Sequence, residues 1–161
     1  MKKNKILFIC TGNTCRSPMA EAIANAKFCE AGMSDEYQAV SAGLFVPFNE
    51  RASEYAVEVC LSHGLDLTRH FSKQLTDAEF DNAYMVLAMT NAHKTELLKK
   101  YGDFRQKVFT IYEIVAIIDK VHNMANYDVT DPYGCEIEAY EMTYALLDNL
   151  IEKIVIHLKG G

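Results

Sequence analysis

Short apolar runs alternate with longer amphipathic segments along this chain. Residues 5–9 form an apolar run that stops at Thr11-Gly12-Asn13, and such a run is typical of a buried strand. The pattern predicts three further strands, at residues 38–42, 83–89 and 107–111. The run at 83–89 is nearly unbroken, so we expect it to be buried on both faces of a sheet.

Helical patterns separate these predicted strands. Ser17 suits the N-cap and Pro18 the first position of a helix, so we expect a helix that opens there and stops near Gly32. Thr90 or Asn91 can cap a later helix. The later helices are predicted at residues 50–62, 91–101, 112–120 and 136–158. In the last one, apolar residues recur every three or four positions and predict one buried stripe.

Strands that alternate with helices predict an α/β fold. We expect a three-layer doubly wound fold, with a four-stranded parallel sheet and helices on both faces. No repeat, low-complexity segment or linker divides the sequence, so we expect a single domain over residues 1–161. Ligands of such sheets bind at the carboxyl ends of the strands. The first predicted strand ends at Cys10, which places the candidate chemistry at that edge.

Composition narrows the class of protein. The 161 residues are 50% hydrophobic and carry a net charge of −6, from 16 basic and 22 acidic residues. This balance argues against disorder, and an acidic chain without a long basic run is a poor nucleic-acid binder. No apolar stretch reaches the ~20 residues of a membrane helix, and the first apolar run is shorter than a signal-peptide core of ~7–15 residues. We therefore predict a cytoplasmic protein with no membrane or nucleic-acid partner.

The segment after the first strand has the parts of an anion site. It is Cys10-Thr11-Gly12-Asn13-Thr14-Cys15-Arg16-Ser17, and we call residues 10–17 the phosphate loop. Successive loop N–H groups and a helix N-terminus bind anions, and Gly12 and Asn13 tolerate the positive φ that such a cradle often needs. Arg16 offers a planar fork to two phosphate oxygens. Helix N-termini and cations lower thiol pKa values, so Cys10 is expected to be a thiolate nucleophile.

Four motifs along the chain resemble one enzyme family. The stretch 10–18, read CTGNTCRSP, looks like the signature of the low-molecular-weight protein tyrosine phosphatases. Ser41-Ala42-Gly43 resembles the family's second-strand motif, residues 70–74 resemble its His-x-x-(Arg/Lys)-Gln segment, and Asp131-Pro132-Tyr133 resembles its general-acid loop. The resemblance covers nearly the whole chain and implies a cysteine-dependent phosphatase.

The resemblance also implies roles for individual residues. Cys10 would attack phosphorus and form a phosphocysteine, Arg16 would hold the equatorial oxygens, and Asp131 would protonate the leaving group and then activate water. Three further residues would support the loop by hydrogen bonds, namely Ser17 on the Cys10 thiolate, Ser41 through Asn13, and His70 behind Ser17. Phosphorylated proteins would be the substrates and inorganic phosphate a product, with no cofactor and no metal.

Thr14 bears on which phosphorylated residue is the substrate. Typical tyrosine phosphatases of the family have an apolar branched residue there, whereas Thr resembles the protein-arginine phosphatase branch of Gram-positive bacteria. The Thr14 hydroxyl can hydrogen-bond beside the reacting phosphorus, and Asp131 can pair with a guanidinium. Tyr133 is expected on the pocket wall and residues 45–48 at its rim. Phosphoarginine is the leading prediction and phosphotyrosine the alternative, although Cys135 departs from the expected glycine.

Two other classes of protein share parts of this pattern. An arsenate reductase of the same fold has a similar loop but needs two further cysteines as a relay, and residues 82–89 contain none. A phosphocarrier module would also place a cysteine after the first strand, but would need neither Arg16 at this spacing nor Asp131. Both remain alternatives to the phosphatase.

The cysteines carry one more open question. Five is an odd number and the spacings show no pairs, which argues against a disulfide scaffold. Cys15 lies five residues after Cys10 and could form a reversible disulfide that protects the nucleophile from over-oxidation. It could equally be a buried structural thiol.

Overall fold

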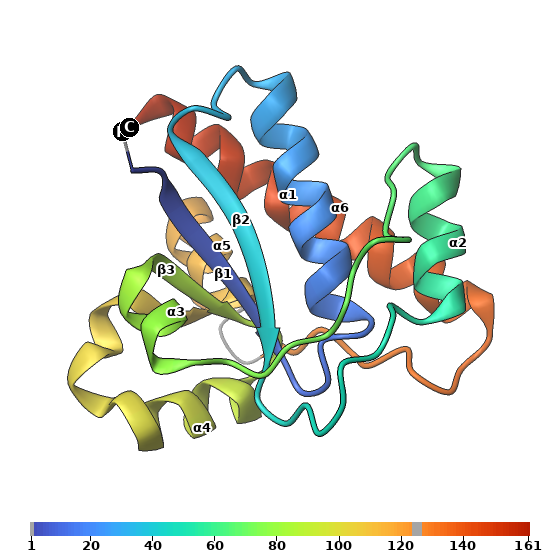
Figure 1. Cartoon of the computed structure of the whole chain (residues 1–161). Coiled ribbons are helices and arrows are strands. Elements are labelled where there is room, and N and C mark those ends of the chain that lie inside the picture. The colour runs from blue at the N-terminus through green and yellow to red at the C-terminus, as the bar shows by residue number, and fades with distance from the viewer. Residues whose placement is uncertain (1, 124–126) are drawn as a thin grey trace.

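A four-stranded parallel sheet forms the centre of the protein, as the sequence predicts. The computed structural model describes residues 2–123 and 127–161. The strand order is β2-β1-β3-β4, and helices cover both faces (Figure 1). The elements in chain order are β1 (Asn4–Cys10), α1 (Arg16–Glu30), β2 (Tyr37–Gly43), α2 (Glu54–Ser62), α3 (Asp77–Asn82), β3 (Ala83–Ala88), α4 (Asn91–Tyr101), the 3-10 helix η1 (Gly102–Lys107), β4 (Val108–Thr110), α5 (Ile111–Asp119) and α6 (Ile137–Gly160).

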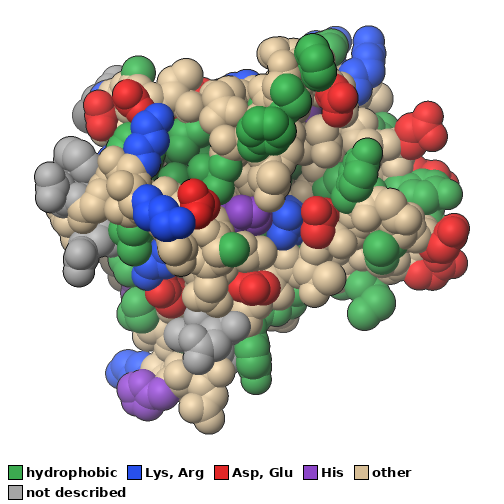
Figure 2. Space-filling view, turned by 90° about the horizontal axis from the view of Figure 1, so that it is seen from below, with side chains coloured by type: hydrophobic (Ala, Val, Ile, Leu, Met, Phe, Trp, Pro, Cys, Tyr) green, Lys and Arg blue, Asp and Glu red, His purple; other side chains and the backbone are tan. Residues whose placement is uncertain are grey.

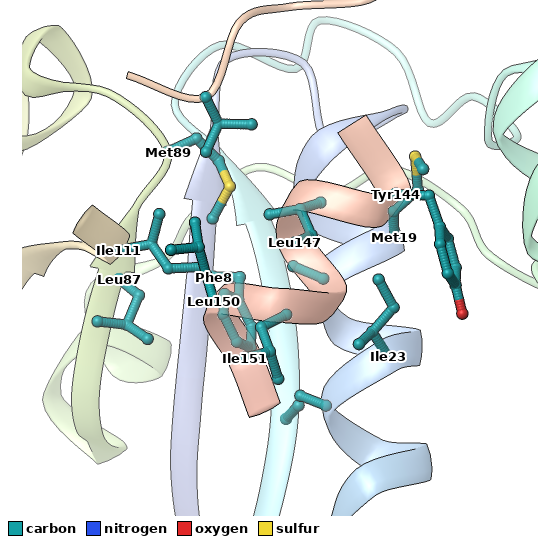
Figure 3. Packing of buried hydrophobic residues seen from close by; sticks show 14 of the residues in the cluster. Phe8, Met19, Ile23, Leu87, Met89, Ile111, Tyr144, Leu147, Leu150 and Ile151 are labelled. Atoms are coloured by element: carbon teal, nitrogen blue, oxygen red, sulfur yellow. The ribbon is translucent and has the colours of Figure 1, made fainter. Parts of the chain in front are cut away.

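The strand β1 holds the two halves of the core together. Successive side chains of a strand point to opposite faces, and here Ile6 and Phe8 pack with α1, α5 and α6. Leu7 and Ile9 instead pack with α3 and α4 on the other face. Figure 3 shows Phe8 among buried apolar side chains of the same cluster, such as Ile111 and Leu150. Because β1 is buried on both faces, the Cys10 at its carboxyl end has a fixed position.

The strand β3 is buried on both faces only in its second half. From Val86 onward its side chains are fully buried, but Tyr84 is 51% exposed. The Tyr84 ring lies edge-on to Tyr37 of β2, with 6.3 Å between the centroids. The prediction of burial along the whole run is therefore wrong at its start, where the Tyr84 ring is exposed beside Tyr37.

Two predicted helix starts are wrong. The helix α1 begins at Arg16 and its N-cap is Cys15, without a side-chain capping bond. Ser17 does not cap it, because the hydroxyl contacts Cys10 instead. The helix α2 begins only at Glu54, since Glu50 is held by the backbone and hydroxyl of Ser72 at 2.7 and 2.8 Å. This pairing keeps the segment before α2 extended and beside the phosphate loop.

Helix-capping residues explain the remaining boundaries. The helix α3 was not predicted, although Thr76 and Glu79 form a capping box that marks its start. Thr90, rather than Asn91, caps α4 by accepting a hydrogen bond from the His93 N–H. The buried stripe of α6 is confirmed, with its last member, Leu158, half-buried. Within the described ranges, no helix has the length and apolar character needed to cross a bilayer.

Candidate active site

The phosphate loop joins β1 to α1 at the carboxyl ends of the parallel strands (Figure 1). Figure 2 shows this end of the molecule, where a histidine, a basic and an acidic side chain lie next to one another near the middle of the face. A pocket of about 240 Å³ opens here. Its walls are made by Cys10, Thr11, Gly12, Asn13, Thr14, Cys15, Arg16, Phe45, Val46, Pro47, Phe48, Glu50, Asp131 and Tyr133. The fold thus brings the phosphate loop together with residues more than 110 positions away.

Cys10 lies at the floor of this pocket and is buried. Its Sγ lies 2.8 Å from the Ser17 hydroxyl oxygen and accepts the Asn13 backbone N–H at 3.3 Å. These contacts and the Arg16 charge lower the thiol pKa, but burial outweighs them, so the pKa of Cys10 lies above its ordinary value. The expected lowering of this pKa is therefore wrong. The loss of water around the sulfur dominates over the loop's dipoles.

Asn13 holds the loop around the sulfur. Its side-chain Nδ2 donates to the hydroxyl oxygens of Ser17 and Ser41, at 2.8 and 3.0 Å, and Ser41 in turn donates to Glu21. Because Ser17 Oγ accepts from Asn13, its own proton is free to point at Cys10 Sγ. The predicted link from Asn13 to Ser41 is present in the structure. Glu21, which ends this chain of hydrogen bonds, was not predicted.

The Asn13 backbone has the left-handed conformation that the cradle was expected to need. Its φ is 56°, so Asn13, rather than Gly12, supplies the positive φ that both residues could tolerate. His70 Nε2 lies 2.8 Å from the Asn13 carbonyl oxygen, which only accepts, so this nitrogen carries the proton. The Lys73 N–H donates to Asn13 Oδ1 at 3.1 Å. His70 therefore supports the loop through Asn13 rather than by a contact with Ser17.

Gly43, at the end of β2, lets the next loop approach closely. It pairs with Cys10 in the sheet. A Cβ on Gly43 would lie 2.6 Å from the Thr11 carbonyl oxygen and 2.5 Å from Val46 Cγ2, which is too close for any side chain. This glycine is what allows residues 45–48 to form a wall of the pocket.

Arg16 and Asp131 form the polar side of the pocket. The buried Arg16 guanidinium donates to the Val129 carbonyl oxygen at 3.0 Å, and its other terminal nitrogen lies 3.4 Å from Asp131 Oδ2. Asp131 is half-exposed and accepts the Tyr133 N–H at 3.1 Å. The pairing with Val129 fixes the guanidinium plane. Asp131 stands at the mouth, where it can reach a group bound above Cys10.

Thr14 is half-buried in the pocket wall. Its hydroxyl oxygen lies 3.7 Å from the Sγ of Cys15, and Cys15 Sγ also contacts Ser53 Oγ at 3.2 Å and the Tyr140 hydroxyl at 3.6 Å. All five cysteines have free thiols in the structure. Cys15 is thus packed among hydroxyl groups of α6 and the segment before α2, and its redox role stays a prediction.

Two residues of the site have no role predicted from the sequence. Glu50 adds a second carboxylate to the wall of the pocket that Asp131 also lines. His93, at the start of α4, lies 2.8 Å through Nε2 from the Thr11 hydroxyl oxygen. The sequence gives neither residue a role at the loop, since each reaches the loop only through the fold. Among the described residues, no three His, Cys, Asp or Glu side chains are close enough to hold a metal ion.

Comparison with known proteins identifies the family. The family model for low molecular weight phosphotyrosine protein phosphatase matches residues 5–160. The chain belongs to this family. A protein-arginine-phosphatase of Bacillus subtilis (strain 168) is 38% identical over 154 residues, which is 96% of either protein. The chain is therefore a cysteine-based low-molecular-weight protein phosphatase, as predicted.

Two solved structures show how similar the fold is. The low molecular weight protein tyrosine phosphatase from T. tengcongensis is 41% identical, with a TM-score of 0.87 over 96% of this chain and 99% of that one. A mutant of the YwlE arginine phosphatase with a phosphorylated active-site serine is 37% identical, with a TM-score of 0.86 over 96% and 95%. The serine adduct fits a phosphoenzyme mechanism. The similar proteins include both arginine and tyrosine phosphatases, so these names leave the substrate of this enzyme open.

Proposed function

We propose that this phosphatase hydrolyses phosphoarginine in proteins through a phosphocysteine on Cys10, and that residues 1–161 form one catalytic domain. The observation that carries the proposal is a single pocket in which Cys10, Arg16, Thr14 and two carboxylates meet. The carboxyl groups of Asp131 and Glu50 suit a guanidinium leaving group, which has only donors and carries positive charge: a protonated Asp131 still accepts through its carbonyl oxygen, and the Glu50 carboxylate adds negative charge. A phosphotyrosine ring offers them no such partner.

The first half of the reaction transfers the phosphoryl group to sulfur. Burial raises the pKa of Cys10, so the thiol has to lose its proton before it can attack, and an oxygen of the bound phosphoryl dianion takes that proton. The thiolate then attacks phosphorus while the P–N bond breaks, and the Asp131 carboxylic acid protonates the leaving nitrogen. Arg16 and the loop N–H groups hold the phosphoryl oxygens and stabilise the charge that builds up on them.

The second half releases inorganic phosphate. The Asp131 carboxylate takes a proton from a water molecule, and this water attacks phosphorus as the P–S bond breaks. The Ser17 hydroxyl, 2.8 Å from Sγ, stabilises the departing thiolate by donating to it. Arginine in the protein substrate and phosphate are the two products, and no cofactor takes part in any step.

Thr14 supports phosphoarginine over phosphotyrosine. Its side chain stands in the pocket wall and brings a hydroxyl to a place where a branched apolar residue would add bulk. A hydroxyl there can bond to the leaving group or to the attacking water, which isoleucine cannot do. The alternative substrate, phosphotyrosine, would gain from an apolar wall at this position.

The test compares two peptides of matched sequence, one with phosphoarginine and one with phosphotyrosine. We expect a higher kcat/KM for phosphoarginine in the wild type and a shift towards phosphotyrosine in Thr14→Ile. Cys10→Ser serves as the control for background hydrolysis. Faster phosphotyrosine turnover in the wild type, with the ratio unchanged in Thr14→Ile, would make the enzyme a tyrosine phosphatase and Thr14 a packing residue.

A further inference from the structure

His93 has an unusual pattern of hydrogen bonds next to the phosphate loop. The side chain is only 6% exposed, and its Nε2 lies 2.8 Å from the hydroxyl oxygen of Thr11. Its other ring nitrogen, Nδ1, is buried and has no hydrogen-bond partner in the described part of the chain. This histidine approaches the loop from α4, and the reaction described above makes no use of it.

The missing partner decides which nitrogen carries the proton. With the proton on Nδ1, an N–H donor would be buried unpaired, which costs more than a lone pair left without a donor. The favoured neutral tautomer therefore has its proton on Nε2 and donates to Thr11 Oγ1. Burial and the nearby Arg16 charge lower the pKa of His93 to about 4, against the opposing effect of Asp128 and Asp131. The ring is thus neutral at physiological pH.

This assignment fixes what the Thr11 hydroxyl offers to a substrate. One lone pair of Oγ1 is taken by His93, so the hydroxyl proton and the second lone pair are free to face the pocket. Thr11 is the most exposed residue of the phosphate loop and lines the pocket, whereas Cys10 and Arg16 are buried. A residue at this exposed position is closer to where a leaving group exits than to the phosphoryl oxygens, which bind beside the buried Cys10 and Arg16.

We propose that His93 is a positioning residue that holds the Thr11 hydroxyl against the leaving group of the substrate. The inference rests on the proposed phosphatase activity and extends it to the recognition of the leaving group. A guanidinium nitrogen can donate to Thr11 Oγ1 and an ester oxygen can accept from it, so the contact serves either substrate.

The test uses two pairs of variants that keep or remove one hydrogen bond. His93→Gln retains an amide donor of similar reach, whereas His93→Met retains the bulk without a donor. Thr11→Ser retains the hydroxyl and Thr11→Val removes it. We expect His93→Met and Thr11→Val each to lower kcat/KM on the phosphoarginine peptide about tenfold, the magnitude of one lost hydrogen bond. His93→Gln and Thr11→Ser should restore most of the loss.

Inhibition by inorganic phosphate distinguishes a positioning role of His93 from a merely structural one. A structural role would change the inhibition constant of phosphate, and a positioning role would not. Phosphate binds to the loop but has no leaving group, so its inhibition constant should stay the same in all four variants. The double variant of His93→Met with Thr11→Val should be no worse than either single variant. His63→Gln is the matched control, since His63 stacks on Tyr144 with 3.9 Å between ring centroids and lines no part of the pocket.

Three results would overturn the inference. The first is a loss of kcat/KM in the double variant that equals the product of the two single losses. The second is weaker inhibition by phosphate in parallel with the lower kcat/KM. The third is wild-type kinetics in both His93→Met and Thr11→Val. Each leaves the proposed function intact, because the wild type still hydrolyses the peptides. A wild type that hydrolyses neither the phosphoarginine nor the phosphotyrosine peptide removes both proposals.

Discussion

The phosphate loop and the rim of the pocket are built in opposite ways. In the loop, Asn13 is fully buried and its side chain makes three hydrogen bonds. At the rim, which we define as residues 45–48 with Tyr133, Phe48 is 74% exposed. Buried hydrogen-bonded groups fix geometry, whereas exposed side chains can change without disturbing the fold. The comparison suggests that the loop determines the reaction and the rim determines which protein is bound.

The largest effect is expected from Arg16, where the loop passes into α1. Arg16→Lys keeps the charge but loses the planar fork and the bond to Val129. We expect kcat/KM to fall by about 10²–10³-fold, the range seen when a preorganised donor is removed from a transition state. Steady-state kinetics on the phosphorylated peptides measure this. A loss below threefold would mean that the loop N–H groups alone hold the phosphoryl group.

Acid should destabilise the folded protein through His93, which lies beside the phosphate loop. The folded protein keeps this ring neutral down to its pKa of about 4, whereas the unfolded chain takes up a proton near 6.5. Between these values the unfolded state binds more protons, so the free energy of unfolding decreases as the pH falls. The wild type should lose up to about 3 kcal/mol more than His93→Gln between pH 6.5 and 4. Urea unfolding at both pH values measures the difference, and parallel losses in the two proteins would contradict it.

Removing one hydroxyl tests how tightly the loop's hydrogen bonds are linked. Ser41→Ala leaves the Asn13 amide and Glu21 without this partner. We expect the free energy of unfolding to fall by about 1–3 kcal/mol, the cost of an unsatisfied buried group, together with a lower kcat. Ser34→Ala, at an exposed position outside the pocket, is the matched control. A stable Ser41→Ala variant with full kcat would show that the loop holds its shape without this bond.

The smallest effect on stability is expected at the rim. Phe48→Ala should change the free energy of unfolding by less than about 0.5 kcal/mol, because the ring is mostly in water. Hydrolysis of a small aryl phosphate should stay the same, while KM for a phosphorylated protein should rise. Equal losses on the small and the protein substrate would break the distinction between rim and loop.

Local patterns predicted the parts of the fold that depend on neighbours in sequence. The apolar run of β1 and the loop that follows it stand where expected, and the four parallel strands are confirmed. Ser17 failed as an N-cap because Cys10 and Asn13 engage its hydroxyl. The pKa of Cys10 was misjudged because the burial of its sulfur depends on tertiary packing, which no local spacing reveals.

The site residues that were missed show the same limit. Glu50 was assigned to a helix, and only its pairing with Ser72, 22 residues away, holds it at the pocket. His93 meets Thr11 across 82 residues. Long-range contacts of this kind leave no periodic or motif signal in a single sequence. The roles of Asp131, His70 and Tyr133 came from resemblance, and kinetics on variants are needed to test them.

The most direct test of the account is whether Cys10 itself carries the phosphoryl group. Asp131→Asn should slow the release of phosphate, because the variant lacks the carboxylate that activates water. After incubation with the phosphoarginine peptide and rapid quenching, mass spectrometry should find one added phosphoryl group on the fragment with Cys10, and none in Asp131→Asn combined with Cys10→Ala. A phosphoryl group on another residue, or turnover in Cys10→Ala, would contradict the phosphocysteine mechanism.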